Sequence, residues 1–221
     1  RTSNNHKMRL QFMNNGDFYL TPEEDKARIE LVRRTIGPDK TLMVDMNCTW
    51  DLDDVLNAKE FFVQNDIFMV EEPIRSDDTA GYIRLTKELG GIKVAGIESE
   101  QGVSRFAELI KADAMDVVQA SLGWAGGFTG CRNIASTAHA FNKLYTPHSF
   151  FSAVMTAANI QFAASQVNIP FIEAEENENP LRTELLKEPI ETDEHMNYYI
   201  TDKPGLGIEL DLDVIEKYII K

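Results

Sequence analysis

Residues 67–73 of the chain read IFMVEEP, an apolar run followed by two adjacent carboxylates and a proline. A short, uninterrupted apolar run of this kind predicts a strand that is buried on both faces. A single acidic ending would mean little, because strands often end at polar residues. The same arrangement recurs along the chain, however, and the recurrence decides the fold.

Apolar runs alternate with amphipathic helical stretches over most of the sequence. The predicted strands cover residues 7–12, 41–45, 67–71, 92–96, 114–119, 143–148 and 170–174. The predicted helices cover residues 21–37, 52–64, 78–89, 104–112, 127–141 and 151–165. A nearly constant βα unit favours a (β/α) barrel over a doubly wound parallel sheet, although the pattern alone leaves both open.

Two further stretches define the organisation of the chain. GWAGGFTG (123–130) is rich in glycine but lacks the Lys-Ser/Thr of a phosphate-binding loop, so it predicts backbone room at a strand-to-helix turn. Beyond residue 175 the repeat stops. Residues 176–221 are therefore expected to form a separate packing unit that ends in a short helix, VIEKYII.

Composition narrows the classes of function. The chain has 221 residues and a net charge of −14, which argues against nucleic acid or an anionic membrane as a partner. There is no apolar run of about 18 residues and no signal-peptide layout at the start. Cys48 and Cys131 lie far apart and suggest neither a zinc site nor a disulfide framework. A cytoplasmic protein is expected.

Three carboxylates stand at the same place in successive repeats. Asp45, Glu71 and Glu98 are separated by 26 and 27 residues, each at or just after the end of a predicted strand. In a parallel barrel these ends lie on one face, so the three groups are expected to converge. Hard oxygen ligands without nearby Cys or His favour Mg²⁺. The alternative for each acid is a helix cap or a solvent-exposed residue.

Other polar residues lie in, or at the ends of, further predicted strands. Lys7 and Arg9 lie two residues apart in the first predicted strand, so they are expected on one side of it. His148 ends KLYTPH, and Glu173 lies in the last predicted strand. Taken singly, the first pair could be a solvated strand edge and the histidine a loop residue or helix cap. With the acids, they predict a site that combines a cation with proton-transfer groups.

Several motifs resemble one known family. LMVDMNCTW, MVEEP, VAGIESE, DVVQASLGWAGGFTG and YTPHS are similar, in order and spacing, to motifs of the mandelate racemase subgroup of the enolase superfamily. The resemblance covers roughly residues 5–175, and KPGLGIELD near the end also looks like that family's C-terminus. It implies a modified TIM barrel, (β/α)7β, in the α/β class.

The resemblance also implies roles for individual residues. Asp45, Glu71 and Glu98 would hold Mg²⁺, with Asn47 near the metal. Lys7 and Arg9, in the place of a K-x-K motif, would lie on one face of the substrate and His148 on the other. Glu173 would hydrogen-bond the substrate carboxylate. The common step of the family is removal of the proton α to a carboxylate.

The chain departs from the family pattern in two ways. Ser121 stands where the family usually has an aspartate paired with the histidine, so His148 is expected to be a weaker base. Residues 1–175 begin at what resembles the second strand, which predicts a partial barrel without the first strand and the capping domain. Residues 176–221 would pack on that capping domain.

These features lead to a functional hypothesis. A Mg²⁺-dependent carbon–oxygen lyase that dehydrates an acid sugar is expected, because racemisation needs a competent base on both faces and Ser121 weakens one. A racemase or epimerase of a 2-hydroxy acid is the alternative, as is a metal-binding barrel that no longer catalyses. The partner would be a small carboxylate substrate, and the family's habit implies a symmetric homo-oligomer.

Overall fold

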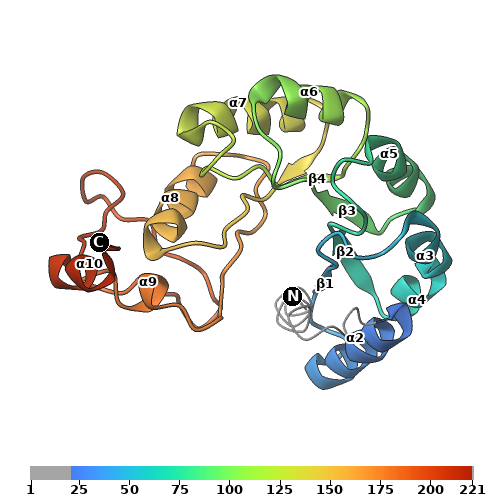
Figure 1. Ribbon diagram of the computed structural model, residues 1–221, viewed down its shortest axis with the longest axis horizontal. Coiled ribbons are helices and arrows are strands. Elements are labelled where there is room, and N and C mark those ends of the chain that lie inside the picture. Colours follow the sequence, from blue (N-terminus) through green and yellow to red (C-terminus); the bar gives the residue numbers. More distant parts are fainter. Residues whose placement is uncertain (1–20, 221) are drawn as a thin grey trace. The chain divides into compact units, whose positions relative to one another are not determined.

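The computed structural model describes residues 21–220 (Figure 1). The predicted strand 7–12, with Lys7 and Arg9, lies outside the described residues. The chain forms two compact units. The first runs to Ile97 and resumes over Ala107–Val118, and the second comprises Glu98–Phe106 and the chain from Gln119 onward.

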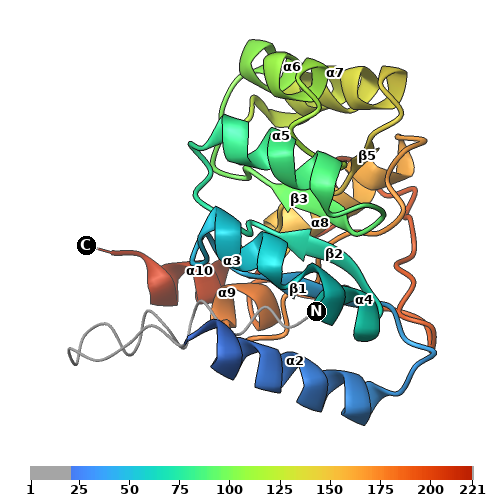
Figure 2. The same cartoon turned by 90° about the vertical axis from the view of Figure 1, so that its right-hand side faces the viewer.

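The first unit is built on parallel strands that follow one another in chain order. They are β1 (Leu42–Asp45), β2 (Ile67–Glu71), β3 (Lys93–Gly96) and β4 (Val117–Val118). Its helices are α2 (Pro22–Ile36), α3 (Leu52–Asn57), α4 (Lys59–Gln64) and α5 (Thr79–Glu88). Helices α3, α4 and α5 lie on one side of β1, β2 and β3, as both views show (Figures 1 and 2). This is the βα order expected from the sequence.

Helix α2 shows how local sequence sets the boundaries of an element. The Thr21 hydroxyl accepts a hydrogen bond from the amide of Glu24, and the Glu24 carboxylate accepts one from the amide of Thr21. Such a capping box is worth about 1 kcal/mol to a helix. Pro22 occupies the first turn, and Gly37 ends the helix with φ 79°. The helix predicted over 21–37 is confirmed.

The helix predicted over 52–64 is interrupted. Ala58 leaves helical geometry at φ −86° and ψ 0°, and separates α3 from α4. Its amide is shared between the carbonyls of Asp54 and Val55, at 3.0 and 3.2 Å. A shared donor of this kind tightens the turn toward 3₁₀ geometry, which periodicity of apolar residues does not reveal.

The core of the first unit lies between the strands and the helices that cover them. The buried side chains from the strands include Leu42, Val44, Met69, Val70, Val94 and Val117, and those from the helices include Ile29, Val55, Phe62, Tyr82 and Leu85. Burying one such side chain contributes about 1.5–3 kcal/mol. This packing fixes where the strands end and therefore where the residues that follow them lie.

The regular secondary structure of the second unit is mostly helix. It contains α7 (Gly127–Ala140), the short strand β5 (Leu144–Tyr145), α8 (Ala153–Ala164), α9 (Pro180–Thr183) and α10 (Leu212–Tyr218). Helix α6 (Val103–Lys111) contains a boundary between the two units. Tyr145 is fully buried against Phe162 of α8, and its hydroxyl donates to the carbonyl of Ala120 at 2.6 Å.

The glycine-rich stretch forms the predicted strand-to-helix turn. Gly126 and Gly127 adopt φ 100° and 62°, a region that favours glycine. Gly130 lies in the first part of α7, and a Cβ on it would collide with the backbone carbonyl of Ala125. Glycine therefore lets the chain turn tightly and approach itself closely here.

Three strand predictions need correction. The predicted strands over 114–119 and 143–148 shrink to the two-residue strands β4 and β5. The strand predicted over 170–174 is wrong, because residues 169–176 carry no strand. The recorded hydrogen bonds there are isolated: the Phe171 carbonyl accepts from the Thr146 hydroxyl at 3.0 Å. An apolar run marks burial, whereas a strand also needs a repeated backbone ladder.

Two expectations from composition concern membranes and cysteines. Among residues 21–220, no helix is both long enough and apolar enough to cross a membrane. Cys48 and Cys131 are both free thiols, and Cys131 is buried in α7.

Candidate active-site residues

Two of the predicted metal ligands are neighbours in the first unit. Asp45 and Glu71 end adjacent parallel strands and are partners in the β1–β2 register. Residues paired in this way lie about 5 Å apart and direct their side chains to the same side of the sheet. Asp45 is 8% exposed and Glu71 is 1% exposed. Burying two carboxylates at paired positions is costly unless neighbouring groups offset their charge.

The turn after β1 adds a buried polar atom near the Asp45 carboxylate. Asn47 adopts φ 48°, and its amide donates to Oδ1 of Asp45 at 3.0 Å. The side-chain nitrogen of Asn47 is buried and has no hydrogen-bond partner within residues 21–220. A buried donor without a partner costs about 1–3 kcal/mol, so this atom is a candidate contact for a ligand.

Glu72 belongs to a different set of contacts. Its Oε1 accepts a hydrogen bond from the Ser76 hydroxyl at 3.0 Å, and Ser76 also contacts the Cys48 sulfur at 3.2 Å. Burial, and secondarily the negative charge of Glu72, raise the pKa of the Cys48 thiol to about 12. Cys48 is therefore protonated at neutral pH and is not a candidate nucleophile.

Two predicted site residues are in direct contact in the second unit. Nε2 of His148 lies 3.1 Å from Oε1 of Glu98, within hydrogen-bond distance. The His148 side chain is buried, and the Glu98 side chain is 22% exposed. A buried imidazole in contact with a partly exposed carboxylate can exchange protons with a bound molecule.

Aromatic rings surround this histidine. The Trp124 indole stacks on the His148 ring with centroids 5.5 Å apart and an interplanar angle of 29°. Phe151 approaches the same imidazole edge-on, with centroids 5.5 Å apart. Nε1 of Trp124 also donates to the backbone carbonyl of Glu98 at 2.6 Å. The rings leave the imidazole few orientations.

Glu173 is buried and held by two protein donors. Its Oε1 accepts from Nε2 of Gln119 at 3.0 Å, and its Oε2 accepts from the amide of Ser149 at 2.8 Å. Gln119 is fully buried, and its Oε1 has no hydrogen-bond partner in the described part of the chain. Because Ser149 follows His148, the Glu173 carboxylate also fixes the backbone beside the histidine.

Ser121 occupies the position of the family's aspartate, but its side chain makes a different contact. Its hydroxyl is fully buried and accepts a hydrogen bond from the amide of Gly123 at 3.1 Å. This is the hydrogen bond found for the Ser121 side chain within residues 21–220, and it stabilises the turn before α7. The contacts seen for the His148 ring within residues 21–220 include Glu98, Trp124 and Phe151.

Sequence reasoning missed Gln119, Ser149 and Trp124. Gln119 had a weak signal, as a polar residue at the end of a predicted strand. Trp124 had a weaker signal, as a large aromatic residue within a glycine-rich turn. For Ser149, which acts through its backbone amide, the side-chain type carries no signal.

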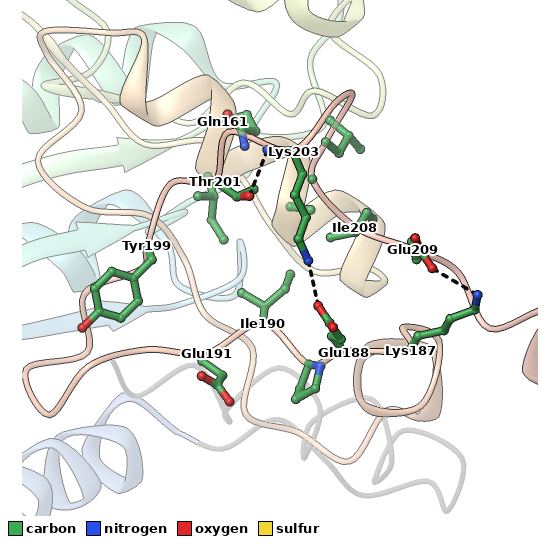
Figure 3. A pocket seen from close by; sticks show the side chains of 15 residues that line it. Gln161, Lys187, Glu188, Ile190, Glu191, Tyr199, Thr201, Lys203, Ile208 and Glu209 are labelled. Carbon is green, nitrogen blue, oxygen red and sulfur yellow. Dashed lines mark hydrogen bonds and ion pairs between the residues drawn. The ribbon is translucent and has the colours of Figure 1, made fainter.

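One cavity of the second unit lies away from these residues. It measures about 510 Å³ and is bordered by α8 and by residues 187–209 (Figure 3). Its apolar wall includes Ile160 and Ile190, and the ion pair of Lys203 with Glu188, at 2.8 Å, lies beside it. None of the predicted site residues within 21–220 lines this cavity.

The predicted metal site with three carboxylate ligands stays untested. Within residues 21–220, no group of three or more His, Cys, Asp or Glu side chains is arranged to hold a metal ion. Asp45 and Glu71 belong to the first unit and Glu98 to the second. Convergence of the three on one ion therefore stays a prediction.

Comparisons with known proteins show which proteins this chain resembles. The arabinonate dehydratase of Saccharolobus solfataricus is 31% identical over 199 residues, which cover 90% of this chain and 52% of that protein. A crystal structure of 3,6-anhydro-D-galactonate cycloisomerase from Zobellia galactanivorans superposes with a TM-score of 0.85 at 30% identity, covering 91% of this chain and 57% of that one.

A third relative was solved with a metal. The crystal structure of a racemase from Streptomyces coelicolor with bound magnesium matches with a TM-score of 0.79 at 26% identity, over 89% of this chain and 52% of that one. The chain spans about half the length of the curated relatives it matches. The structural matches confirm the predicted α/β fold of the barrel type.

A family model of enolase C-terminal domain-like proteins matches residues 4–214. The match covers nearly the whole chain, and the relatives named above include a dehydratase, a cycloisomerase and a racemase. The chain therefore belongs to the enolase C-terminal domain-like family, in the mandelate racemase group of the enolase superfamily.

Proposed function

We propose that the protein containing this chain is a Mg²⁺-dependent lyase that dehydrates an acid sugar. The observation that supports this most is the contact between His148 and Glu98, which puts a proton-transfer group beside a candidate metal ligand. The relationship to an arabinonate dehydratase supports the class of substrate.

The ligands proposed for Mg²⁺ are Asp45, Glu71 and Glu98. Buried carboxylate oxygens are the donor type that Mg²⁺ prefers, and the register of Asp45 with Glu71 supplies two of them at adjacent strand ends. The buried Asn47 side-chain nitrogen fits a further contact to a substrate oxygen. When bound, the ion would supply positive charge where negative charge develops on the substrate carboxylate.

The proton transfers are assigned to two residues. Lys7 would remove the α-proton, and the neighbouring guanidinium of Arg9 would favour the neutral, basic form of the lysine. His148 would give a proton to the departing β-hydroxyl from the other face of the substrate. Glu173, held by Gln119 and the Ser149 amide, is proposed to contact the substrate carboxylate.

An isomerase is the second candidate. The match to a cycloisomerase structure at 30% identity favours it, because such enzymes act on related acid sugars by name. Racemisation is less favoured, since it needs an effective base on each face and Ser121 bonds to Gly123. The third possibility is a metal-binding barrel that no longer catalyses.

A substrate screen tests the proposal. The natural protein that carries this chain is incubated with Mg²⁺ and a library of acid sugars, and 2-keto-3-deoxy products are measured. The proposal predicts product that disappears with Lys7→Ala and remains with Lys87→Ala, a substitution of an exposed lysine on α5. Cyclised or epimerised product would favour the isomerase, and no turnover of any acid sugar would favour the inactive barrel.

A further inference from the structure

Trp124 contacts both members of the His148–Glu98 pair. Its indole ring stacks on the His148 imidazole, and its Nε1 donates to the Glu98 carbonyl at 2.6 Å. The same ring meets Phe151 edge-on with centroids 5.1 Å apart. One side chain therefore braces the backbone that presents a carboxylate and the ring that faces this carboxylate.

The position of Trp124 in the chain gives it this reach. It lies in the turn between Ser121 and the glycines at 126 and 127, whose positive φ values allow a sharp change of direction. The backbone amide of Trp124 donates to the Ser121 carbonyl at 3.3 Å, so the turn itself is hydrogen-bonded. The indole is thus held at its base by the turn and at its tip by Glu98.

The side chain at position 121 supplies no carboxylate partner for His148. A carboxylate at that position could hold an imidazole through a charged hydrogen bond, but the Ser121 hydroxyl is engaged with Gly123. Stacked aromatic pairs contribute about 0.5–1.5 kcal/mol beyond burial and restrict the ring to one plane. An imidazole without either support would sample more orientations.

We propose that Trp124 is a positioning residue that orients the His148 ring toward Glu98, in the place of a carboxylate partner at position 121. The inference rests on the proposed function in assigning His148 a proton-transfer role. Trp124 itself touches the histidine and need not touch the substrate. Its effect is therefore expected in the catalytic step more than in substrate binding.

The stacking has a spectroscopic signature that does not depend on activity. An imidazole above an indole face experiences the ring current of that indole, so its ring signals are displaced. The chain has four histidines, and with ¹³C-labelled histidine the His148 signal is assigned by its loss in His148→Asn. Trp124→Ala removes the ring, whereas Trp124→Phe keeps a ring and removes the Nε1 donor.

The expected result has two parts. Trp124→Ala abolishes the displacement of the His148 signal and lowers kcat about 10- to 100-fold, with KM little changed, as for other groups that orient a functional histidine. Trp124→Phe keeps most of the displacement and of kcat. Phe141→Ala, which removes an exposed ring at the end of α7, changes neither.

Two results overturn the inference: an unchanged His148 signal in Trp124→Ala, or a lost displacement with unchanged kcat. If Trp124→Ala does not fold, Trp124→Leu takes its place as the ring-free variant, with the same outcomes. If no acid sugar is turned over, the proposed function fails, whereas the stacking of Trp124 on His148 is still judged by the His148 signal in Trp124→Ala.

Discussion

Nε2 of His148 lies 3.1 Å from Oε1 of Glu98, so a candidate proton-transfer group and a candidate metal ligand touch within one compact unit. The imidazole is buried, stacked by Trp124 and bordered by Phe151. Burial and ring contacts allow this imidazole fewer orientations than a histidine on the surface has. The pair is therefore the part of the proposed site that can be tested residue by residue.

Loss of the imidazole should stop the proposed dehydration. In His148→Asn the side chain can no longer transfer a proton at neutral pH, and general acid–base catalysis typically contributes about 10²- to 10⁴-fold in rate. We expect a fall in kcat of that size with the acid sugar found in the screen. His195→Asn is the control, since the His195 side chain is 76% exposed. Equal activity of both variants would contradict the role of His148.

The Glu173 carboxylate should contribute to stability as well as to the site. In Glu173→Gln one acceptor becomes an NH₂ group that faces either the Gln119 donor or the Ser149 amide, so a buried donor loses its partner. The expected loss is about 1–3 kcal/mol in the free energy of unfolding, measured by urea denaturation. Glu178→Gln, at an exposed position, should change it little. Equal stability of the two variants would count against the hydrogen-bond network.

Gly130→Ala should destabilise the protein although alanine is the better helix former. Propensity alone predicts a gain of about 1 kcal/mol within α7. The new Cβ would collide with the Ala125 carbonyl, and overpacking of this kind costs about 1–3 kcal/mol. Asn133→Ala, on the exposed side of α7, should be neutral or slightly stabilising. A higher melting temperature for Gly130→Ala would contradict the close approach.

The thiol of Cys48 should react slowly at neutral and mildly alkaline pH. Its pKa is raised to about 12, so the folded protein keeps the proton where an ordinary thiol loses it. Because the unfolded chain then binds fewer protons, Cys48 should also lower stability as pH rises above about 9. Alkylation by iodoacetamide, followed by mass spectrometry of the Cys48 peptide at pH 7–9.5, checks this against the denatured protein. Fast modification of the native protein at pH 8 would contradict it.

The sequence predicted the parts of the structure that depend on local or repeated patterns. The capping residues of α2, the limits of β2 and the register of Asp45 with Glu71 follow from short-range signals and from a constant repeat. The proximity of His148 to Glu98 agrees with the prediction that they belong to one site, although the direct contact was not anticipated.

Other features depend on long-range packing that periodicity does not encode. The stacking of Trp124 on His148 joins two segments that lie far apart in the sequence, and a tight glycine turn follows the first of them. Residues 170–174 have the apolar pattern of a strand, but the pattern cannot say whether a backbone ladder forms. The shared amide of Ala58 divides a helix that is continuous in its pattern.

Binding of Mg²⁺ by Asp45, Glu71 and Glu98 is the central claim, and a thermal melt of the natural protein with and without Mg²⁺ tests it most directly. A ligand bound only by the folded state at 100 times its Kd adds about 2.7 kcal/mol, so the melting temperature should rise with Mg²⁺. The account predicts that Asp45→Asn, Glu71→Gln and Glu98→Gln each abolish this increment, whereas Asp39→Asn, at an exposed position, keeps it. An undiminished increment in the three variants, or none in the natural protein, would contradict the account.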